Sequence, residues 1–199
     1  MLLFASLAFA AWPEPPSSGW ETVQATPKIA CTTDAAGLPW CYAEQDVTAT
    51  FDRVVGVIKD LERYPDTFDH VDKVAKLDAD TAWIHVDYPS PLTDRDYIAA
   101  FALSATAVVP GSDPAGAKNA FHLRFHAVEH AAAPPATEEV IRLPRAAGGY
   151  DCWDLGNGQT RIRYTWETEI LGDLPSWISD RARLQHGTEV VVGIGERAK

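Results

Sequence analysis

The chain has 199 residues, and its 17 lysines and arginines against 28 aspartates and glutamates give a formal net charge of −11. Residues 1–100 hold 7 basic and 16 acidic groups, and no basic stripe is present, which argues against nucleic-acid binding and against adsorption by charge to an anionic membrane. The length suits one domain with a short extension, and a hydrophobic content of 46% indicates a globular rather than a disordered chain.

The first residues have the pattern of a secretory signal peptide. Leu2 to Ala11 form an uncharged apolar run, residues 8–10 fit a cleavage site, and a proline-rich leader follows to residue 18. No lysine or arginine precedes the run, so the alternative is a hydrophobic helix packed on the body of the protein. The first interpretation predicts export to the periplasm or the extracellular space, and the second predicts a cytoplasmic protein.

Short strands and a candidate disulfide follow the leader. The expected strands are Trp20–Gln24, Lys28–Thr32 and Trp40–Ala43. Cys31 and Cys41 flank a turn-rich stretch that predicts a hairpin, so in an oxidising compartment they would form a disulfide. The third cysteine, Cys152, is expected to be a small buried side chain.

After residue 46 the spacing of the apolar residues changes from that of strands to that of a helix. Asp46 is a suitable N-cap, and Tyr64-Pro65 ends the helix because the residue before a proline disfavours helical conformation. Between them, apolar residues at steps of three and four predict a helix of about four turns with one buried stripe. The stripe consists of Phe51, Val54, Val55, Ile58 and Leu61.

The middle and second half of the chain alternate between apolar and polar residues, which predicts antiparallel strands. The clearest strands are Phe121–Ala127 and Arg161–Ile170, and the turn at residues 156–158 predicts a hairpin that joins the second of these to Tyr150–Leu155. The apolar faces contain Phe121, Leu123, Phe125, Ile162, Tyr164, Trp166 and Ile170.

The last element is a long helix that opens at Leu174, with Asp173 as its cap and Pro175 in its first turn. Three glycines weaken it. Arg181 interrupts its apolar side, and either hydrogen-bonds a ligand inside a cavity or extends into solvent. The expected apolar side consists of Leu174, Trp177, Ile178, Leu184, Val191 and Val192.

This order of elements predicts an α+β domain in which a curved antiparallel sheet wraps a helix. The sequence YPSPLTDRDYI at Tyr88–Ile98 resembles the START family, the steroidogenic-acute-regulatory-related lipid-transfer domains, where a strand leads into Pro-x-Pro and an Arg-Asp-aromatic-aliphatic stretch opens the next strand. The helix ending at residues 57–60, the hairpin at 149–166 and the helix entry at 171–178 are also similar to that family. We therefore divide the chain into a signal and leader, residues 1–18, and a START-like domain, residues 19–199.

The resemblance implies a helix-grip fold with an internal hydrophobic cavity that shields a lipid such as a sterol or a phospholipid. It implies a non-enzymatic protein that binds and transfers this ligand without a cofactor or a metal, and we expect a monomer that contacts membranes transiently near the C-terminal helix. The predicted ligand-binding residues are Phe101, Phe121, Phe125, Trp153, Ile162, Tyr164, Trp166, Trp177, Ile178, Arg181 and Leu184.

Arg95 and Asp96 are adjacent on an expected strand, so their side chains point to opposite faces and cannot form a catalytic dyad. We predict structural roles for both residues, as for Cys31 and Cys41. For Arg95 two interpretations remain, an ion pair with a neighbouring aspartate (Asp87 or Asp94) or a contact with a ligand head group.

Two alternative functions remain. The first is an enzyme similar to polyketide cyclases or aromatases, which would use an ionisable side chain inside the same cavity. The candidates for that side chain are Asp87, His85 and Arg181. The second is an interaction module with a filled core, which a cavity smaller than about 300 Å³ would support.

Overall fold

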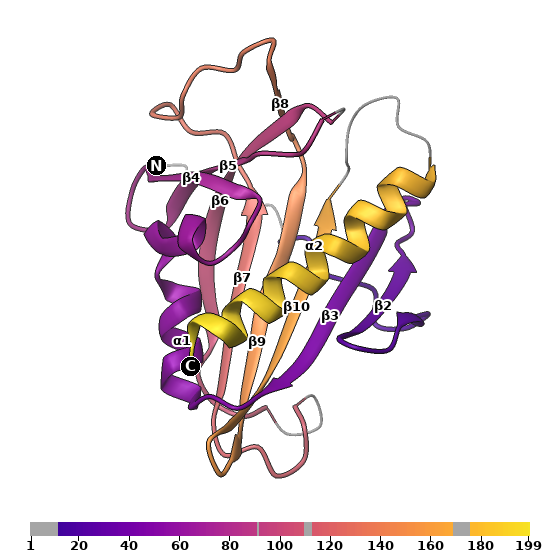
Figure 1. Cartoon of the computed structure of the whole chain (residues 1–199), viewed down its shortest axis with the longest axis vertical. Helices are drawn as coiled ribbons and strands as arrows, with labels where there is room; N and C mark the ends of the chain where they lie inside the picture. Colours follow the sequence, from indigo (N-terminus) through magenta and orange to yellow (C-terminus); the bar gives the residue numbers. More distant parts are fainter. Residues whose placement is uncertain (1–11, 91, 110–112, 169–175) are drawn as a thin grey trace, which may run out of the picture.

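The computed structural model describes residues 12–90, 92–109, 113–168 and 176–199. Within them, a ten-stranded sheet curves around helix α2 (Ser176–Arg197), which crosses it diagonally (Figure 1). The strand order is β1-β2-β3-β10-β9-β7-β6-β5-β4; these neighbours are antiparallel, and β8 pairs in parallel with β6. The strands are β1 (Glu21–Gln24), β2 (Lys28–Thr33), β3 (Pro39–Val47), β4 (Val71–Lys76), β5 (Thr81–Val86), β6 (Asp94–Ala105), β7 (Ala120–Ala127), β8 (Val140–Arg142), β9 (Ala146–Gly156) and β10 (Gln159–Thr168).

The alternating pattern gives the sheet an apolar inner face, toward α2, and a polar outer face. In β10, Ile162, Tyr164 and Trp166 are buried on the inner face, whereas Arg161 and Arg163 lie on the outer face and pair with carboxylates of β3. The predicted β9–β10 hairpin is confirmed, and all three residues of its turn (156–158) have positive φ. Cys152 is buried, as predicted.

The predicted first helix is shorter than expected. Helix α1 (Phe51–Lys59) is followed by a separate 3₁₀ helix, η1 (Leu61–Asp66), and Val54 and Ile58 of the predicted stripe are fully buried. The prediction of Asp46 as N-cap is wrong, because Asp46 belongs to β3 and accepts hydrogen bonds from Arg161 of β10 at 2.6 and 2.8 Å. The N-cap is Thr50. Cross-strand pairing with β10 therefore takes precedence over the local helix signal.

The buried side of α2 coincides only in part with the predicted one. Val191 is buried and Leu184 packs against the core, as predicted, whereas the predicted Trp177 is 66% exposed. Val190 and Ile194, which the prediction did not include, are also buried. The packing side is defined by small residues as well as apolar ones, since Gly187 is also buried against the sheet. The predicted cap, the first turn of the helix and the end of the preceding strand, at residues 169–175, lie outside the described residues.

Candidate functional site

A cavity of about 60 Å³ lies between the inner face of the sheet and the first half of α2. It is placed where the helix-grip arrangement was expected to leave a pocket. Its volume is well below the roughly 300–1,000 Å³ of ligand pockets. A ligand-sized cavity is therefore not present at this site in this conformation, which is the result that the sequence analysis attached to an interaction module with a filled core.

Parallel aromatic rings form one wall of the cavity. The ring of Tyr164 stacks on Trp166 at 5.2 Å and on Phe125 at 6.3 Å between centroids, with interplanar angles of 11° and 13°. Tyr150 packs against Tyr164 at 4.9 Å. These residues come from three neighbouring strands, β7, β9 and β10, so the sheet holds the wall in place. A flat apolar molecule could lie against it.

A hydrogen-bonded pair forms a polar point on this wall. The hydroxyl of Tyr164 lies 3.1 Å from Nε2 of His186, which comes from α2. Burial lowers the pKa of His186, against an opposing effect of Glu189, and burial raises the pKa of Tyr164. Both side chains are therefore uncharged near neutral pH, and the pair can exchange a hydrogen bond with a polar group on an otherwise apolar ligand.

Glu189 ties the middle of α2 to the chain just before β4. Its carboxylate accepts a hydrogen bond from the backbone N–H of His70 at 2.8 Å, and its other oxygen lies 2.8 Å from Nδ1 of the same residue. The two contacts hold α2 over the cavity, so any outward movement of its first half must bend the helix there or break them.

Arg95 lies on the cavity lining with Tyr88 beside it. The guanidinium carbon is 5.6 Å from the centroid of the Tyr88 ring, and Nη1 donates to the carbonyl of Thr93. Burial lowers the pKa of Arg95, while Tyr88 and Asp94 act in the opposite direction. Asp96 lies on the outer face, where it accepts hydrogen bonds from Arg142 at 2.9 Å and from Trp83 at 2.7 Å.

The predicted ligand-binding residues fall into three groups. Phe125, Tyr164 and Trp166 line the cavity. Phe101, Phe121 and Ile162 lie on the inner face and belong to the core around it.

The third group faces away from the cavity, and for these residues the prediction needs correction. Trp153 pairs in register with Arg161 and lies on the outer face. Trp177 and Arg181 are exposed, and Arg181 and Leu184 line a groove between α2 and residues 67–70, with Leu184 also packed against the core. Ile178 is half-buried and is not part of the cavity lining. The shift in the helix phase accounts for all the α2 residues in this group.

The candidates for an enzymatic role do not line the cavity either. His85 lies on the outer face, with Nδ1 2.5 Å from a carboxylate oxygen of Asp72, and Asp87 is exposed. Apart from tyrosines, the ionisable groups that line it are His70, Arg95, Arg183, His186 and Glu189, of which the sequence analysis had singled out only Arg95. The spacing of Ala182, His186, Glu189 and Val190 on one helix face was the signal that could have identified His186 and Glu189.

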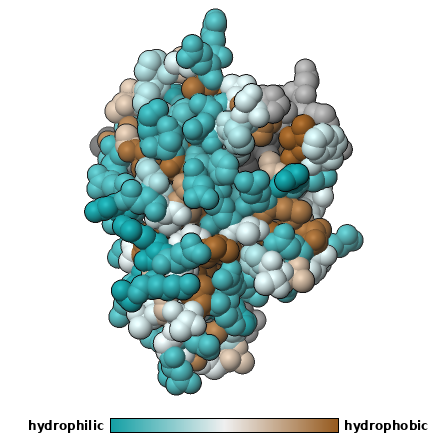
Figure 2. Space-filling view, in the orientation of Figure 1, coloured by the Kyte–Doolittle hydropathy of each residue, from teal (hydrophilic) through white to brown (hydrophobic). Residues whose placement is uncertain are grey.

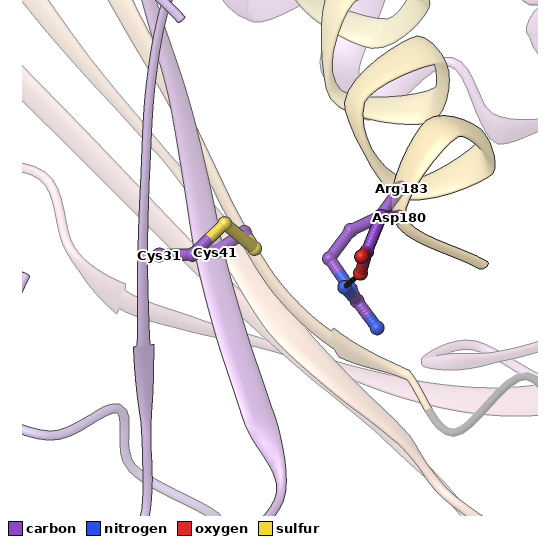
Figure 3. Close-up of a disulfide and its surroundings, with 4 residues drawn as sticks. All are labelled: Cys31, Cys41, Asp180 and Arg183. Carbon is purple, nitrogen blue, oxygen red and sulfur yellow. Dashed lines mark hydrogen bonds and ion pairs between the residues drawn. A yellow bond between two sulfur atoms is a disulfide. The ribbon is translucent and has the colours of Figure 1, made fainter. Parts of the chain in front are cut away.

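The disulfide predicted between Cys31 and Cys41 is present, and it joins β2 to β3 at directly paired positions with Cα atoms 4.1 Å apart. Figure 3 shows it opposite the ion pair between Asp180 and Arg183 in the first turns of α2. The bridge therefore braces the part of the sheet that faces the first half of the helix.

Removing this disulfide with the double substitution Cys31→Ala and Cys41→Ala is expected to lower the free energy of unfolding by about 2 kcal/mol, because the short loop between the cysteines is no longer closed in the unfolded chain. Urea unfolding of both proteins measures the difference. In the presence of a reductant the parent protein should lose most of its advantage; a difference that persists unchanged would contradict a role for the bridge.

No family model matches the sequence, and no curated protein is similar enough in sequence to count as a match. Solved structures do match. A STAR-related lipid transfer protein from Xanthomonas axonopodis is 19% identical over 91% of this chain and 99% of that one, with a TM-score of 0.70. Human StAR-related lipid transfer protein 5 is 15% identical over 92% and 88%, with a TM-score of 0.72.

An enzyme is also among the similar structures. An aromatase/cyclase from a Streptomyces species is 17% identical over 79% of this chain and 92% of that one, with a TM-score of 0.51. The identities are low, so the likeness concerns the fold. The curved antiparallel sheet closed by a C-terminal helix is therefore the helix-grip fold of START-related lipid-transfer domains.

Proposed function

We propose that this protein binds a lipid-like hydrophobic ligand, such as a sterol or a phospholipid, between α2 and the inner face of the sheet, and transfers it between membranes as a non-enzymatic monomer. The observation that carries the proposal is the aromatic wall of Phe125, Tyr150, Tyr164 and Trp166, with the polar pair of Tyr164 and His186 on it. A filled core does not need an uncharged polar pair beside a cavity.

Ligand entry requires the cavity to enlarge, because about 60 Å³ cannot hold a sterol. The first half of α2 is the part of the wall that can move. Its residues 177–186 are exposed or half-buried, whereas the second half is anchored by buried Val190, Val191 and Ile194. Figure 2 shows only separate hydrophobic patches on the side of the molecule that carries α2, so a closed helix shields the apolar interior from water.

Extraction of the purified protein with organic solvent, followed by mass spectrometry, tests the proposal. We expect a co-purified lipid, or saturable binding of a fluorescent sterol or phospholipid. Ala146→Phe places a large ring in the cavity lining and should abolish binding, whereas Ala102→Phe, on the outer face of β6, should not. A protein that carries no lipid and binds none of the probes would leave the filled-core interaction module as the better interpretation.

A cyclase-like or aromatase-like enzyme is the second candidate. The Tyr164–His186 pair favours it, since a phenol and a neutral imidazole in contact could exchange a proton with a bound substrate. Tyr164→Phe separates the two functions: it should remove product formation in an enzyme, and should change only the affinity in a carrier.

We also propose that the exposed Trp177 contacts the membrane during transfer. No helix in the described residues is long and apolar enough to span a bilayer. An indole at the end of α2 is suited to the membrane interface. Trp177→Glu is expected to slow sterol transfer between vesicles about fivefold, while Val23→Glu, at an exposed valine of β1, serves as the control. Equal rates for the two variants would contradict this contact.

We also propose that the protein is exported, because the disulfide between Cys31 and Cys41 would be stable in an oxidising compartment. The mass of the mature protein, recovered from the compartment where it accumulates, tests this. A mass that lacks the apolar N-terminal run would support cleavage, and the full-length mass in the cytoplasm would oppose it.

A further inference from the structure

A row of charged side chains crosses the outer face of the sheet. Glu44 of β3 pairs in register with Arg163 of β10, and Asp151 of β9 pairs with Arg163 on one side and His122 of β7 on the other. Arg163 donates to Glu44 at 2.8 Å, and one oxygen of Asp151 lies 2.7 Å both from Nδ1 of His122 and from Nη1 of Arg124. The charges alternate along the row and largely compensate one another.

The neighbouring row is hollow in its middle. It runs from Tyr42 through Thr165 and Gly149 to Arg124, so two small residues separate an aromatic end from a cationic end. A Cβ on Gly149 would lie 2.4 Å from the carbonyl oxygen of Leu123 and 2.7 Å from the Arg124 side chain. The absence of a side chain at Gly149 lets Arg124 lie across β9 and leaves the outer surface of the sheet uncovered there.

The proline-rich leader forms a roof over this hollow. At one end Trp20 donates from Nε1 to the carbonyl of Pro16 at 3.0 Å, and at the other the ring of Trp12 packs on His126 with centroids 4.1 Å apart. Pro13, Pro15 and Pro16 line the space between the leader and the sheet, which amounts to about 600 Å³. We call this space the leader groove; its volume is within the range of ligand pockets.

The two ends of the leader groove differ in chemistry. At the aromatic end, the Tyr42 ring lies 5.1 Å from Trp20 and 4.8 Å from the guanidinium carbon of Arg163. At the other end, both hydrogen bonds of Arg124 come from Nη1, and its Nε and Nη2 donate none to any residue that the structure describes. That free edge of the guanidinium has the fork geometry that binds a carboxylate with two parallel hydrogen bonds.

We propose that the leader groove is a second ligand site, for a small planar aromatic carboxylate, on the opposite face of the sheet from the lipid cavity. The aromatic body lies beneath the prolines of the leader, against the side of the contacting Tyr42–Trp20 pair, and the carboxylate binds the free edge of Arg124. Because the sheet separates the two spaces, this proposal does not depend on the lipid function. Salt weakens the binding, since the guanidinium is partly exposed.

Titration of the full chain with naphthoate, followed by amide NMR, tests the site. We expect saturable shifts on the outer-face residues of β3, β9 and β10. Arg124→Gln should weaken binding about tenfold, and Arg124→Lys should weaken it similarly because lysine keeps the charge but lacks the fork. Arg161→Gln is the matched control: Arg161 lies on the same face of β10, bonds Asp46, and is outside the groove.

Naphthamide, the neutral analogue, should bind about tenfold more weakly than naphthoate. Equal affinities for the two compounds, equal weakening by Arg124→Gln and Arg161→Gln, or shifts confined to α2 and the inner face would each overturn the proposal. A protein that carries lipid but does not bind naphthoate would refute this site alone and leave the lipid function intact.

Discussion

Replacing Gly187 with alanine is expected to lower the free energy of unfolding by about 3 kcal/mol, although alanine is the better helix former. A Cβ at this position would lie 2.2 Å from Cη2 of Trp166, in the aromatic wall of the cavity. The ring is fully packed, so α2 or the indole must move. Urea unfolding of the variant and the parent protein measures the change.

Gly56 provides the opposite control in the same protein. It lies in α1 and is exposed, and a Cβ there would meet no atom within 4 Å. Gly56→Ala should therefore stabilise the protein by about 0.5–1 kcal/mol. If Gly187→Ala were as favourable as Gly56→Ala, α2 would not approach the sheet as closely as the structure has it.

The Gly187 variant also bears on ligand entry. Moving the helix away from Trp166 enlarges the cavity, so the variant should take up a fluorescent sterol faster than the parent protein even though it is less stable. A destabilised variant with unchanged uptake would indicate that the ligand enters at another edge of the cavity.

The helix contacts explain why the sequence analysis predicted the buried side of α2 only in part. Gly187 and Gly195 approach Trp166 and Val47 more closely than any side chain would permit, and hydrophobicity gives glycine no weight in a packing face. The predicted apolar side was therefore rotated relative to the packing side: it includes the exposed Trp177 as well as the buried Val191. The alternation in β10 had no such competitor, and its inner face was predicted correctly down to Ile162, Tyr164 and Trp166.

The polar features of the two faces were harder to predict, because they depend on register. The contact between Tyr164 and His186 requires knowing how α2 lies on β10, and the contact between Glu189 and His70 joins residues 119 positions apart. The cavity volume could not be predicted at all, because a volume of about 60 Å³ reflects small differences in side-chain packing. The short hairpin around the disulfide could be predicted from the sequence, because the two cysteines and the turn between them are close together in the chain.

His122 is expected to make the stability of the protein depend on pH. Its Nδ1 lies 2.7 Å from Asp151 and its Nε2 3.2 Å from Asp113. The hydrogen bond to Asp151 is the largest cause that raises the pKa of His122; burial opposes it, and the charge of both aspartates adds to it. The protonated imidazole thus joins β7 and β9 to the loop that carries Asp113.

The sign of the effect follows from the direction of the shift. The folded protein holds the His122 proton more tightly than the unfolded chain, where the pKa is about 6.5. The stabilisation is complete below about pH 6.5 and is lost as the pH rises through the higher pKa of the folded protein. The advantage of the parent protein over His122→Gln should therefore shrink as the pH is raised above about 6.5.

Comparing the two proteins at each pH isolates this group. The pKa values of His126 and His186 are lowered by burial, so these residues favour folding as the pH rises; they titrate in both proteins and cancel in the difference. Asp151→Asn should reduce the same pH dependence, with Asp113 still in place, and cost about 3 kcal/mol, because Arg124 and His122 lose their shared carboxylate. An advantage of the parent protein that grew with pH would show that His122 is neutral in the folded state, and that Asp151 is bound chiefly by Arg124.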